Sequence, residues 1–105
     1  GQYCHNTGIL DNGDLNNSTS KSGGWSKFLS TGLENENVAT LLQEAGYSTG
    51  LVGKYMNGYD LNGKGKETTA GLHKPPGWDR WMGLLKCFAY YGPIFADNGE
   101  RVLRT

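Results

Sequence analysis

The sequence is poor in the residues that build a buried parallel sheet. Valine and isoleucine together number 5 among 105 residues, whereas glycine alone numbers 17. Buried parallel strands are typically rich in valine and isoleucine, so the chain cannot supply a complete parallel α/β sheet by itself. Its length leaves room for at most a single small domain.

Two further absences exclude whole classes of function. No run approaches the roughly 18 apolar residues of a membrane-spanning helix, so no membrane span is expected. The 10 basic and 10 acidic residues give a formal net charge of zero. This balance provides no electrostatic basis for binding nucleic acid or an anionic bilayer.

Cysteine is scarce as well. Cys4 and Cys87 lie far apart, without a Cys-x-x-Cys motif or a histidine pair at zinc-ligand spacing, so no zinc site is expected. The two residues are equally compatible with one long-range disulfide and with two unpaired buried thiols.

What is abundant is asparagine and glycine, chiefly in loops. Asn16 and Asn17 begin two overlapping Asn-x-Ser/Thr triplets, which suit a secreted glycoprotein, although such triplets also arise by chance in an Asn-rich loop. Residues 4–24 are expected to form a surface loop and residues 60–74 an insertion-like loop. The sequence opens at Gly1 without a Met and closes without a helix stop or turn, so we expect an internal fragment that is incomplete at both ends.

The clearest regular element is a helix over residues 35–45. Asn35 can cap its start, and Thr31 with Glu34 offers an alternative capping box. Gly46 suits the left-handed residue that ends a helix. One apolar helical face is formed by Val38, Leu41, Leu42 and Ala45.

A strand over residues 47–53 is expected directly after this helix. A helix that leads into a strand is a step of a layered α/β fold. Lys54 then follows the carboxyl end of the strand, where open α/β sheets bind ligands. Lys54 is therefore either an anion-binding cation or an ordinary surface lysine.

Two other groups of residues are candidates for binding. His5, beside Asn6, could hydrogen-bond a polar ligand or could be an exposed loop histidine, and His73 is expected to be solvated. A rigid Pro-Pro-Gly-Trp turn begins an aromatic segment that forms either a buried cluster or a platform for stacking on sugar rings. Its members are Trp78, Trp81, Tyr90 and Tyr91.

Several segments, in chain order, resemble the arylsulfatase family, including its glucosamine-6-sulfatase-like branch. These segments are residues 1–7, 23–27, 41–49, 52–57, 76–78 and 83–84. The resemblance implies an alkaline-phosphatase-like α/β fold, of which residues 1–105 would be part of the N-terminal catalytic domain. It also implies hydrolysis of sulfate esters, either aryl or sugar sulfates.

The resemblance further implies a formylglycine nucleophile, made from a Cys-x-Pro-Ser-Arg motif and held beside calcium. That motif is missing, and neither Cys4 nor Cys87 can replace it. Residues 97–99 are similar to a calcium-ligand Asp-Asn-Gly but follow Pro-Gly-Trp too closely to be a metal site. The nucleophile and the calcium ligands are therefore expected outside this fragment, which should be inactive alone.

Four residues take their expected roles from the family. Lys54 matches the lysine that contacts the sulfate and the formylglycine, and a cation placed there would stabilise developing negative charge. Met56 stands where many sulfatases have a histidine, which matches the branch in which Asn57 would face the pocket. His5 and Asn6 resemble the His-Asn near the substrate entrance of that branch.

The leading expectation is thus a fragment of a calcium-dependent sulfatase that is secreted, lysosomal or associated with the cell wall. A second expectation, from another class, is a secreted non-enzymatic glycan-binding module that uses the aromatic segment. A third is a truncated or pseudogene product that never folds.

Overall fold

The computed structural model describes residues 1–13, 23–59, 73–85 and 90–104. Its helices are α1 (Cys4–Thr7), α2 (Gly24–Ser30) and α3 (Val38–Glu44), with a 3-10 turn at Leu33–Asn35. Its strands are β1 (Gly50–Gly53), β2 (Arg80–Leu84), β3 (Ile94–Asp97) and β4 (Glu100–Leu103). The expected mixed α/β class is confirmed.

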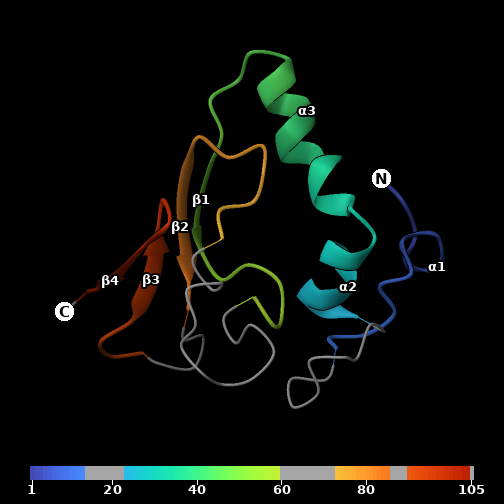
Figure 1. Ribbon diagram of the computed structural model, residues 1–105. Coiled ribbons are helices and arrows are strands. Elements are labelled where there is room, and N and C mark those ends of the chain that lie inside the picture. The colour runs from blue at the N-terminus through green and yellow to red at the C-terminus, as the bar shows by residue number, and fades with distance from the viewer. Residues whose placement is uncertain (14–22, 60–72, 86–89, 105) are drawn as a thin grey trace.

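The four strands form one sheet in the order β1-β2-β3-β4. Strands β1 and β2 are parallel, whereas β2, β3 and β4 form an antiparallel meander, and α2 and α3 lie along one side of the sheet (Figure 1). The sequence predicted the strand that corresponds to β1 and did not predict β2, β3 or β4. The scarcity of valine and isoleucine excludes only a complete parallel sheet, because antiparallel strands need one apolar face at most.

Helix α3 begins later than predicted. It starts at Val38, and the Asn37 side chain accepts hydrogen bonds from the backbone N–H groups of Ala39 and Thr40. The Thr40 hydroxyl reciprocates by accepting from the Asn37 N–H at 2.9 Å, which completes a capping box. The predicted cap at Asn35 is wrong, because that residue ends the 3-10 turn. At the other end Gly46 has φ of 90°, as predicted for the end of a helix.

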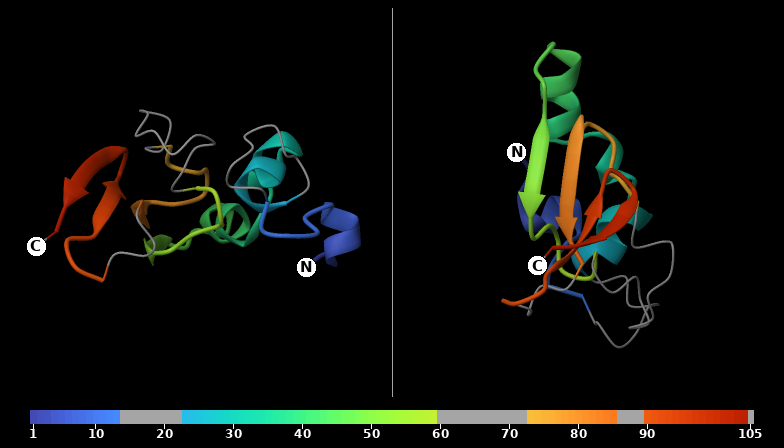
Figure 2. Two further views of the ribbon diagram at one scale, coloured as in Figure 1. Left: turned by 90° about the horizontal axis from the view of Figure 1, so that it is seen from below. Right: turned by 90° about the vertical axis from the view of Figure 1, so that its left-hand side faces the viewer.

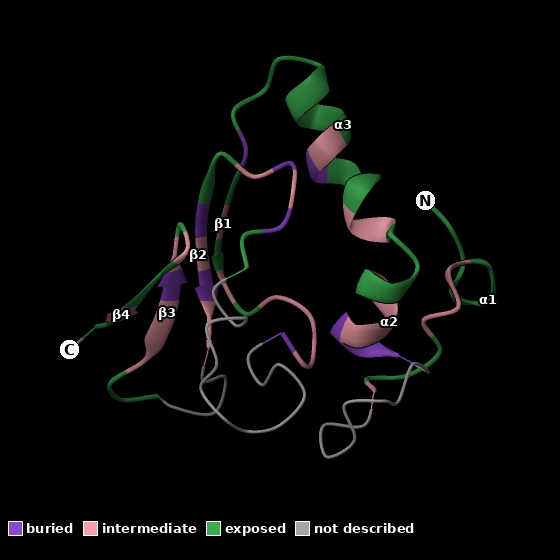
Figure 3. Ribbon diagram, viewed as in Figure 1, coloured by how far each residue is buried: buried purple, intermediate pink, exposed green. Residues whose placement is uncertain are grey.

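The apolar face that predicts α3 lies on the exposed side of the helix (Figure 3). Val38 is 68% exposed, Leu41 56% and Leu42 40%, whereas Ala39 is buried. The reason is a close backbone approach, since a Cβ atom on Gly77 would lie 2.5 Å from the backbone nitrogen of Thr40. Helix α3 therefore packs against the Pro-Gly-Trp turn through its small residue.

Three boundaries differ from the predictions for the loops and the first strand. The predicted loop over residues 4–24 contains α1 and the first residue of α2, while residues 14–22 lie outside the described part of the chain. Strand β1 begins at Gly50 rather than at Tyr47. Of the predicted insertion-like loop, residues 60–72 also lie outside the described residues.

Strands β3 and β4 are joined by a two-residue turn at Asn98 and Gly99. Their φ angles are 48° and 95°, both in the left-handed region. Asn-Gly is the preferred pair for such hairpin turns because both residues tolerate positive φ. This hairpin was not predicted from the sequence.

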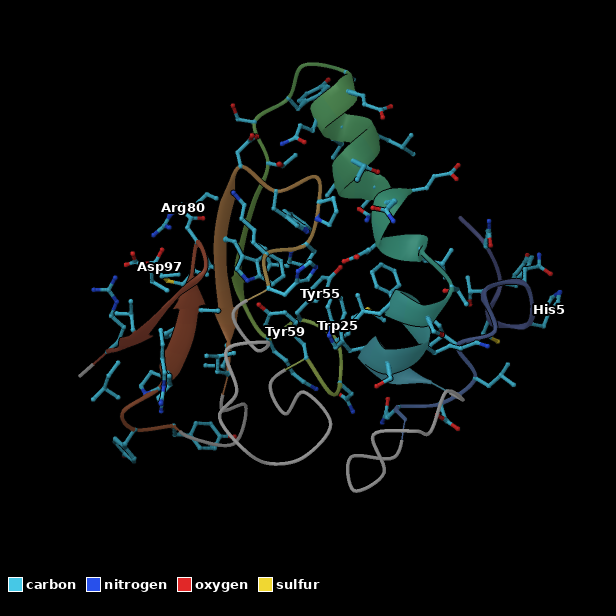
Figure 4. All side chains as sticks on the ribbon, viewed as in Figure 1. His5, Trp25, Tyr55, Tyr59, Arg80 and Asp97 are labelled. Atoms are coloured by element: carbon cyan, nitrogen blue, oxygen red, sulfur yellow. The ribbon has the colours of Figure 1, made fainter. Side chains whose placement is uncertain are left out.

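The core is an aromatic cluster between α2 and the sheet. Its buried members are Trp25, Tyr59, Trp81 and Ala96. Ring centroids lie 5.3 Å apart for both the Trp25–Tyr59 and Tyr59–Trp81 pairs, with nearly perpendicular planes, an arrangement that aromatic quadrupoles favour. Figure 4 shows Trp25 of α2 gathered here with Tyr55 and Tyr59, which belong to the loop that follows β1.

The core also satisfies its polar groups. The Trp81 indole N–H donates to the Tyr59 hydroxyl at 2.8 Å, and that hydroxyl donates to the backbone carbonyl of His73 at 2.7 Å. Burial raises the pKa of Tyr59 to about 12, so its phenol stays protonated and can donate. The segment before the Pro-Pro-Gly-Trp turn is thereby fixed to the core.

Candidate functional site

The candidate site is the loop that leaves the carboxyl end of β1. Lys54 is exposed, and its ammonium donates a hydrogen bond to the side-chain oxygen of Asn57. Two residues that were predicted to face one pocket thus lie together. The amide oxygen of Asn57 carries no charge, so it orients the ammonium without forming an ion pair with it.

The backbone of this loop is fixed at several points. The Trp25 N–H donates to the Asn57 carbonyl at 2.8 Å, and the Tyr59 N–H donates to the Met56 carbonyl at 3.1 Å. Tyr59 is buried in the core, and Met56 packs against it. The Lys54–Asn57 pair therefore lies on a loop anchored to both α2 and the sheet, which limits the motion of the ammonium.

Met56, two residues after Lys54, packs toward the core. It is half-buried and packs against the aromatic core. Met56 stands where the family resemblance implies a histidine in many sulfatases, and in this chain it contributes to the packing of the core.

The structure does not place His5 and Asn6 beside Lys54. Both lie on α1, which is at the far side of α2 from the sheet (Figures 2 and 4). The His5 ring stacks on Tyr3, with centroids 5.8 Å apart, and both residues are exposed. In this arrangement α1 and the loop after β1 are separate surfaces.

The predicted four-residue sugar-stacking platform is wrong as a set. Trp81 is fully buried, with 0% of its surface exposed, whereas Tyr90 and Tyr91 are 97% and 94% exposed. Trp78 is half-buried and packs against the core. The alternative prediction of a buried aromatic cluster holds for Trp81, which belongs to the core, and in part for Trp78, which packs against it.

The described residues do not provide a calcium site. The Asp97 carboxylate binds the guanidinium groups of Arg80 and Arg104, and the side-chain oxygen of Asn98 accepts from the backbone N–H of Trp81 at 2.8 Å. The hydrogen bond from Arg80 is the main reason that the pKa of Asp97 lies below its usual range. Among the residues that the structure describes, no three His, Cys, Asp or Glu side chains converge as metal ligands.

Sequence reasoning missed a hydrogen bond between Glu34 and His73 on the edge of the core. Glu34 Oε2 lies 2.8 Å from His73 Nε2, and the His73 ring packs 5.8 Å from that of Trp25. Glu34 also acts on Tyr55, whose pKa is raised mainly by burial and further by the charge of Glu34.

His73 was predicted to be solvated, and it is exposed but hydrogen-bonded to Glu34. No spacing in the sequence signals a contact between residues 39 positions apart.

Of the four remaining candidates, the structure describes only Cys4. Cys4 is an exposed, free cysteine on α1, and Cys87 lies outside the described residues. Asn16 and Asn17 also lie outside them. Within the described part of the chain, no helix has the length and apolar character needed to cross a membrane.

Comparison with known proteins shows which proteins this chain is similar to. The chain is 35% identical over 101 residues to a Caenorhabditis elegans protein described as an extracellular sulfatase Sulf-1 homolog, covering 96% of this chain. It is 33% identical over 102 residues to the extracellular sulfatase SULF-1 homolog of Drosophila melanogaster, and 30% identical over 101 residues to an arylsulfatase of Volvox carteri. The chain is therefore related to the sulfatases over nearly its whole length, and the predicted resemblance is confirmed.

The chain spans only a small part of these relatives, namely 12%, 8% and 14% of their respective lengths. No protein-family model and no solved structure matches it. The chain is thus similar to one part of each of these sulfatases.

Proposed function

We propose that this chain is part of the N-terminal catalytic domain of a sulfuric ester hydrolase with an alkaline-phosphatase-like fold. The observation that carries the proposal is the Lys54–Asn57 pair at the carboxyl end of β1, within a chain related to sulfatases. Carboxyl ends of strands are where open α/β sheets bind ligands.

The role of Lys54 is to hold the sulfate group of the substrate. Its ammonium has three donors, of which the bond to Asn57 uses one, so two remain for sulfate oxygens. Negative charge builds on those oxygens and on the leaving oxygen as the ester bond breaks. A fixed cation stabilises this charge more in the transition state than in the bound ester, which lowers the barrier.

Asn57 positions the ammonium of Lys54 and presents its own amide toward the same pocket. The anchoring of its backbone to Trp25 keeps that arrangement preformed, so little reorganisation is needed on binding. His5 and Asn6 would contact the substrate only through the part of the ester distant from the sulfate, because α1 lies beyond α2.

The remaining catalytic groups come from outside these 105 residues in our proposal. Cys4 lacks the Cys-x-Pro-Ser-Arg context of a formylglycine, and the described acidic groups do not fit calcium. A longer polypeptide supplies the nucleophile and the calcium ligands, and the fragment alone is inactive. We also propose that this polypeptide is extracellular, because the names of two relatives describe extracellular sulfatases. In that case Asn16 or Asn17 would carry a glycan.

Expression of the uninterrupted reading frame that contains this sequence tests the proposal. We expect the polypeptide to release sulfate from an aryl sulfate, with the matching aryl phosphate as a control for specificity. The 105-residue chain alone should release none. A folded long polypeptide with no activity on aryl or sugar sulfates would contradict the proposal.

A further inference from the structure

The ring of Tyr55 packs into the aromatic core, although Tyr55 directly follows the exposed Lys54 in the chain. Tyr55 is half-buried. Its ring meets two rings of α2, that of Trp25 at 5.8 Å and that of Phe28 at 6.4 Å between centroids. It also meets the Trp81 ring of β2 at 5.0 Å. One side chain of the loop after β1 thus contacts both the helix and the sheet (Figure 4).

The angles between these rings give the Tyr55 ring a defined orientation. Its plane meets that of Trp81 at 81° and that of Tyr59 at 87°, so both pairs are edge-to-face. Aromatic quadrupoles favour this arrangement over face-to-face stacking. An aliphatic side chain at this position could fill part of the same volume, but it would not reproduce these directional contacts.

Lys54 therefore lies between two fixed points of the backbone. On one side, Gly53 pairs with Gly83 in the parallel register of β1 and β2. On the other side, the ring of Tyr55 is held in the core. Successive Cα atoms are only about 3.8 Å apart, so a displacement of Tyr55 also displaces the Lys54 backbone. The hydrogen bond to Asn57 orients the end of the Lys54 side chain, whereas Tyr55 fixes its base.

The phenol of Tyr55 adds no negative charge to the residue next to Lys54. Burial raises the pKa of Tyr55, and the charge of Glu34 raises it further. The phenol is therefore protonated and neutral at neutral pH, and it does not compete with an anion for the ammonium of Lys54.

We propose that Tyr55 is a positioning residue for Lys54, because its ring, held by α2 and β2, sets the place from which the ammonium meets an anion. The proposal rests on the proposed role of Lys54 in holding sulfate, and it adds a residue that acts without touching the sulfate. A tyrosine that only packs the core would affect stability alone. A positioning tyrosine acts through Lys54, so its effect on function disappears when Lys54 is removed.

A double-mutant cycle in the polypeptide that the reading frame encodes tests the proposal. Two quantities are measured below the unfolding temperature of every variant, namely kcat/KM for an aryl sulfate and the dissociation constant for inorganic sulfate. We expect Tyr55→Leu to lower kcat/KM about 10-fold or more and to weaken sulfate binding about threefold or more, because the cation loses its alignment. In the Lys54→Ala background, Tyr55→Leu should change neither quantity by more than about twofold.

Two further variants separate positioning from loss of packing. Tyr55→Phe keeps the ring, so both quantities should stay within about twofold of wild type. Leu85→Ala removes apolar atoms from the same core at a residue distant in sequence from Lys54. It should lower the midpoint of thermal unfolding and leave both quantities within about twofold of wild type. If Tyr55→Leu does not fold, Tyr55→Met takes its place in the cycle.

Four results would overturn the proposal. Tyr55→Leu could leave both quantities unchanged, or could lower them equally with and without Lys54, which would make Tyr55 independent of the lysine. An equal loss in Leu85→Ala would indicate general loosening of the core. An equal loss in Tyr55→Phe would assign the effect to the hydroxyl and not to the ring.

Sulfate binding distinguishes failure of the proposal from failure of the proposed function. If the wild type hydrolyses no sulfate ester, the proposed function fails, and the cycle on inorganic sulfate alone decides the role of Tyr55. If sulfate binding is also the same in wild type and Lys54→Ala, then Lys54 holds no anion and the positioning role is overturned as well.

Discussion

Thr49 and Asp79 bind each other at the start of the two parallel strands. The Thr49 N–H donates to Asp79 Oδ2 at 2.8 Å, and the Asp79 N–H donates to the Thr49 hydroxyl oxygen at 3.1 Å. The same hydroxyl donates to the Gly77 carbonyl. Residues from two segments that carried the family resemblance, 41–49 and 76–78, are therefore joined, and this contact aligns β1 with β2.

Removal of the Thr49 hydroxyl should destabilise the fold. Thr49→Val keeps the shape of the side chain but leaves the Gly77 carbonyl without its donor in a buried environment. We expect the free energy of unfolding to fall by about 1–3 kcal/mol. Ser48→Ala at the exposed neighbouring position is the control and should change it by less than about 0.5 kcal/mol. Equal effects in urea titrations would show that the hydroxyl does not join the strands.

The same pair should make stability depend on acid pH. The backbone hydrogen bond from Thr49 is the main reason that the pKa of Asp79 is lowered, and the side chain of Gln43 adds to it. A carboxyl with a lowered folded-state pKa stabilises the fold above its unfolded pKa, and this contribution is lost as pH falls through the lowered value. Unfolding should therefore become easier below about pH 4.

Asp79→Asn isolates that contribution. The pKa of Asp97 is also lowered, so the wild-type curve contains both carboxyls. The difference in unfolding free energy between wild type and Asp79→Asn should shrink as pH falls from 5 toward about 2. A difference that is constant across this range would contradict the assigned role of the carboxylate.

Gly77 should tolerate no side chain. Its φ is 90°, and a Cβ atom would lie 2.5 Å from the Thr40 nitrogen and 2.8 Å from the Ala39 carbonyl carbon. We expect Gly77→Ala to cost about 2–4 kcal/mol, from backbone strain and from displacement of α3. Gly46→Ala is the matched control, because Gly46 has the same φ but no atom within 4 Å of the added Cβ. If thermal melts show equal losses for both variants, the turn does not press on α3.

Tyr59→Phe should weaken the core through one lost hydroxyl. The Trp81 indole N–H would lose its acceptor inside a fully buried cluster, while the aromatic packing stays the same. We expect a loss of about 1–3 kcal/mol in unfolding free energy. Tyr47→Phe, at a residue that is 64% exposed, should have little effect. A neutral Tyr59→Phe variant would indicate that the Trp81 N–H finds another partner.

The sequence predicted the parts of the fold that depend on local patterns. The helical spacing of Val38, Leu41, Leu42 and Ala45 predicted α3, and Gly46 predicted its end. It could not predict which side of the helix is covered, because that depends on the contact between Gly77 and Ala39, which are distant in sequence. Strands β2 to β4 were not predicted, although Asn98-Gly99 is a strong hairpin signal. These strands are only four or five residues long and lie close to Gly and Pro residues, so they show no extended strand pattern in the sequence.

The candidate site was predicted unevenly for a similar reason. Lys54 and Asn57 are three positions apart, so their contact follows from one local turn. His5 depends on the placement of α1, which lies on the other side of α2 from the sheet. The sequence left two alternatives for Trp81, a buried cluster or an exposed platform for sugar rings. In β2 the side chains alternate between faces, with Arg80 exposed and Trp81 buried, so Trp81 belongs to the buried cluster.

The most direct test of the account is the turnover of an aryl sulfate by the long polypeptide carrying Lys54→Ala. The matched control is Lys27→Ala, which removes an equal charge from α2, and both variants should retain the wild-type unfolding midpoint. We predict that kcat/KM falls about 100-fold or more for Lys54→Ala and is unchanged for Lys27→Ala. Wild-type kcat/KM in the Lys54→Ala variant would contradict the role of this lysine as the cation that holds the sulfate.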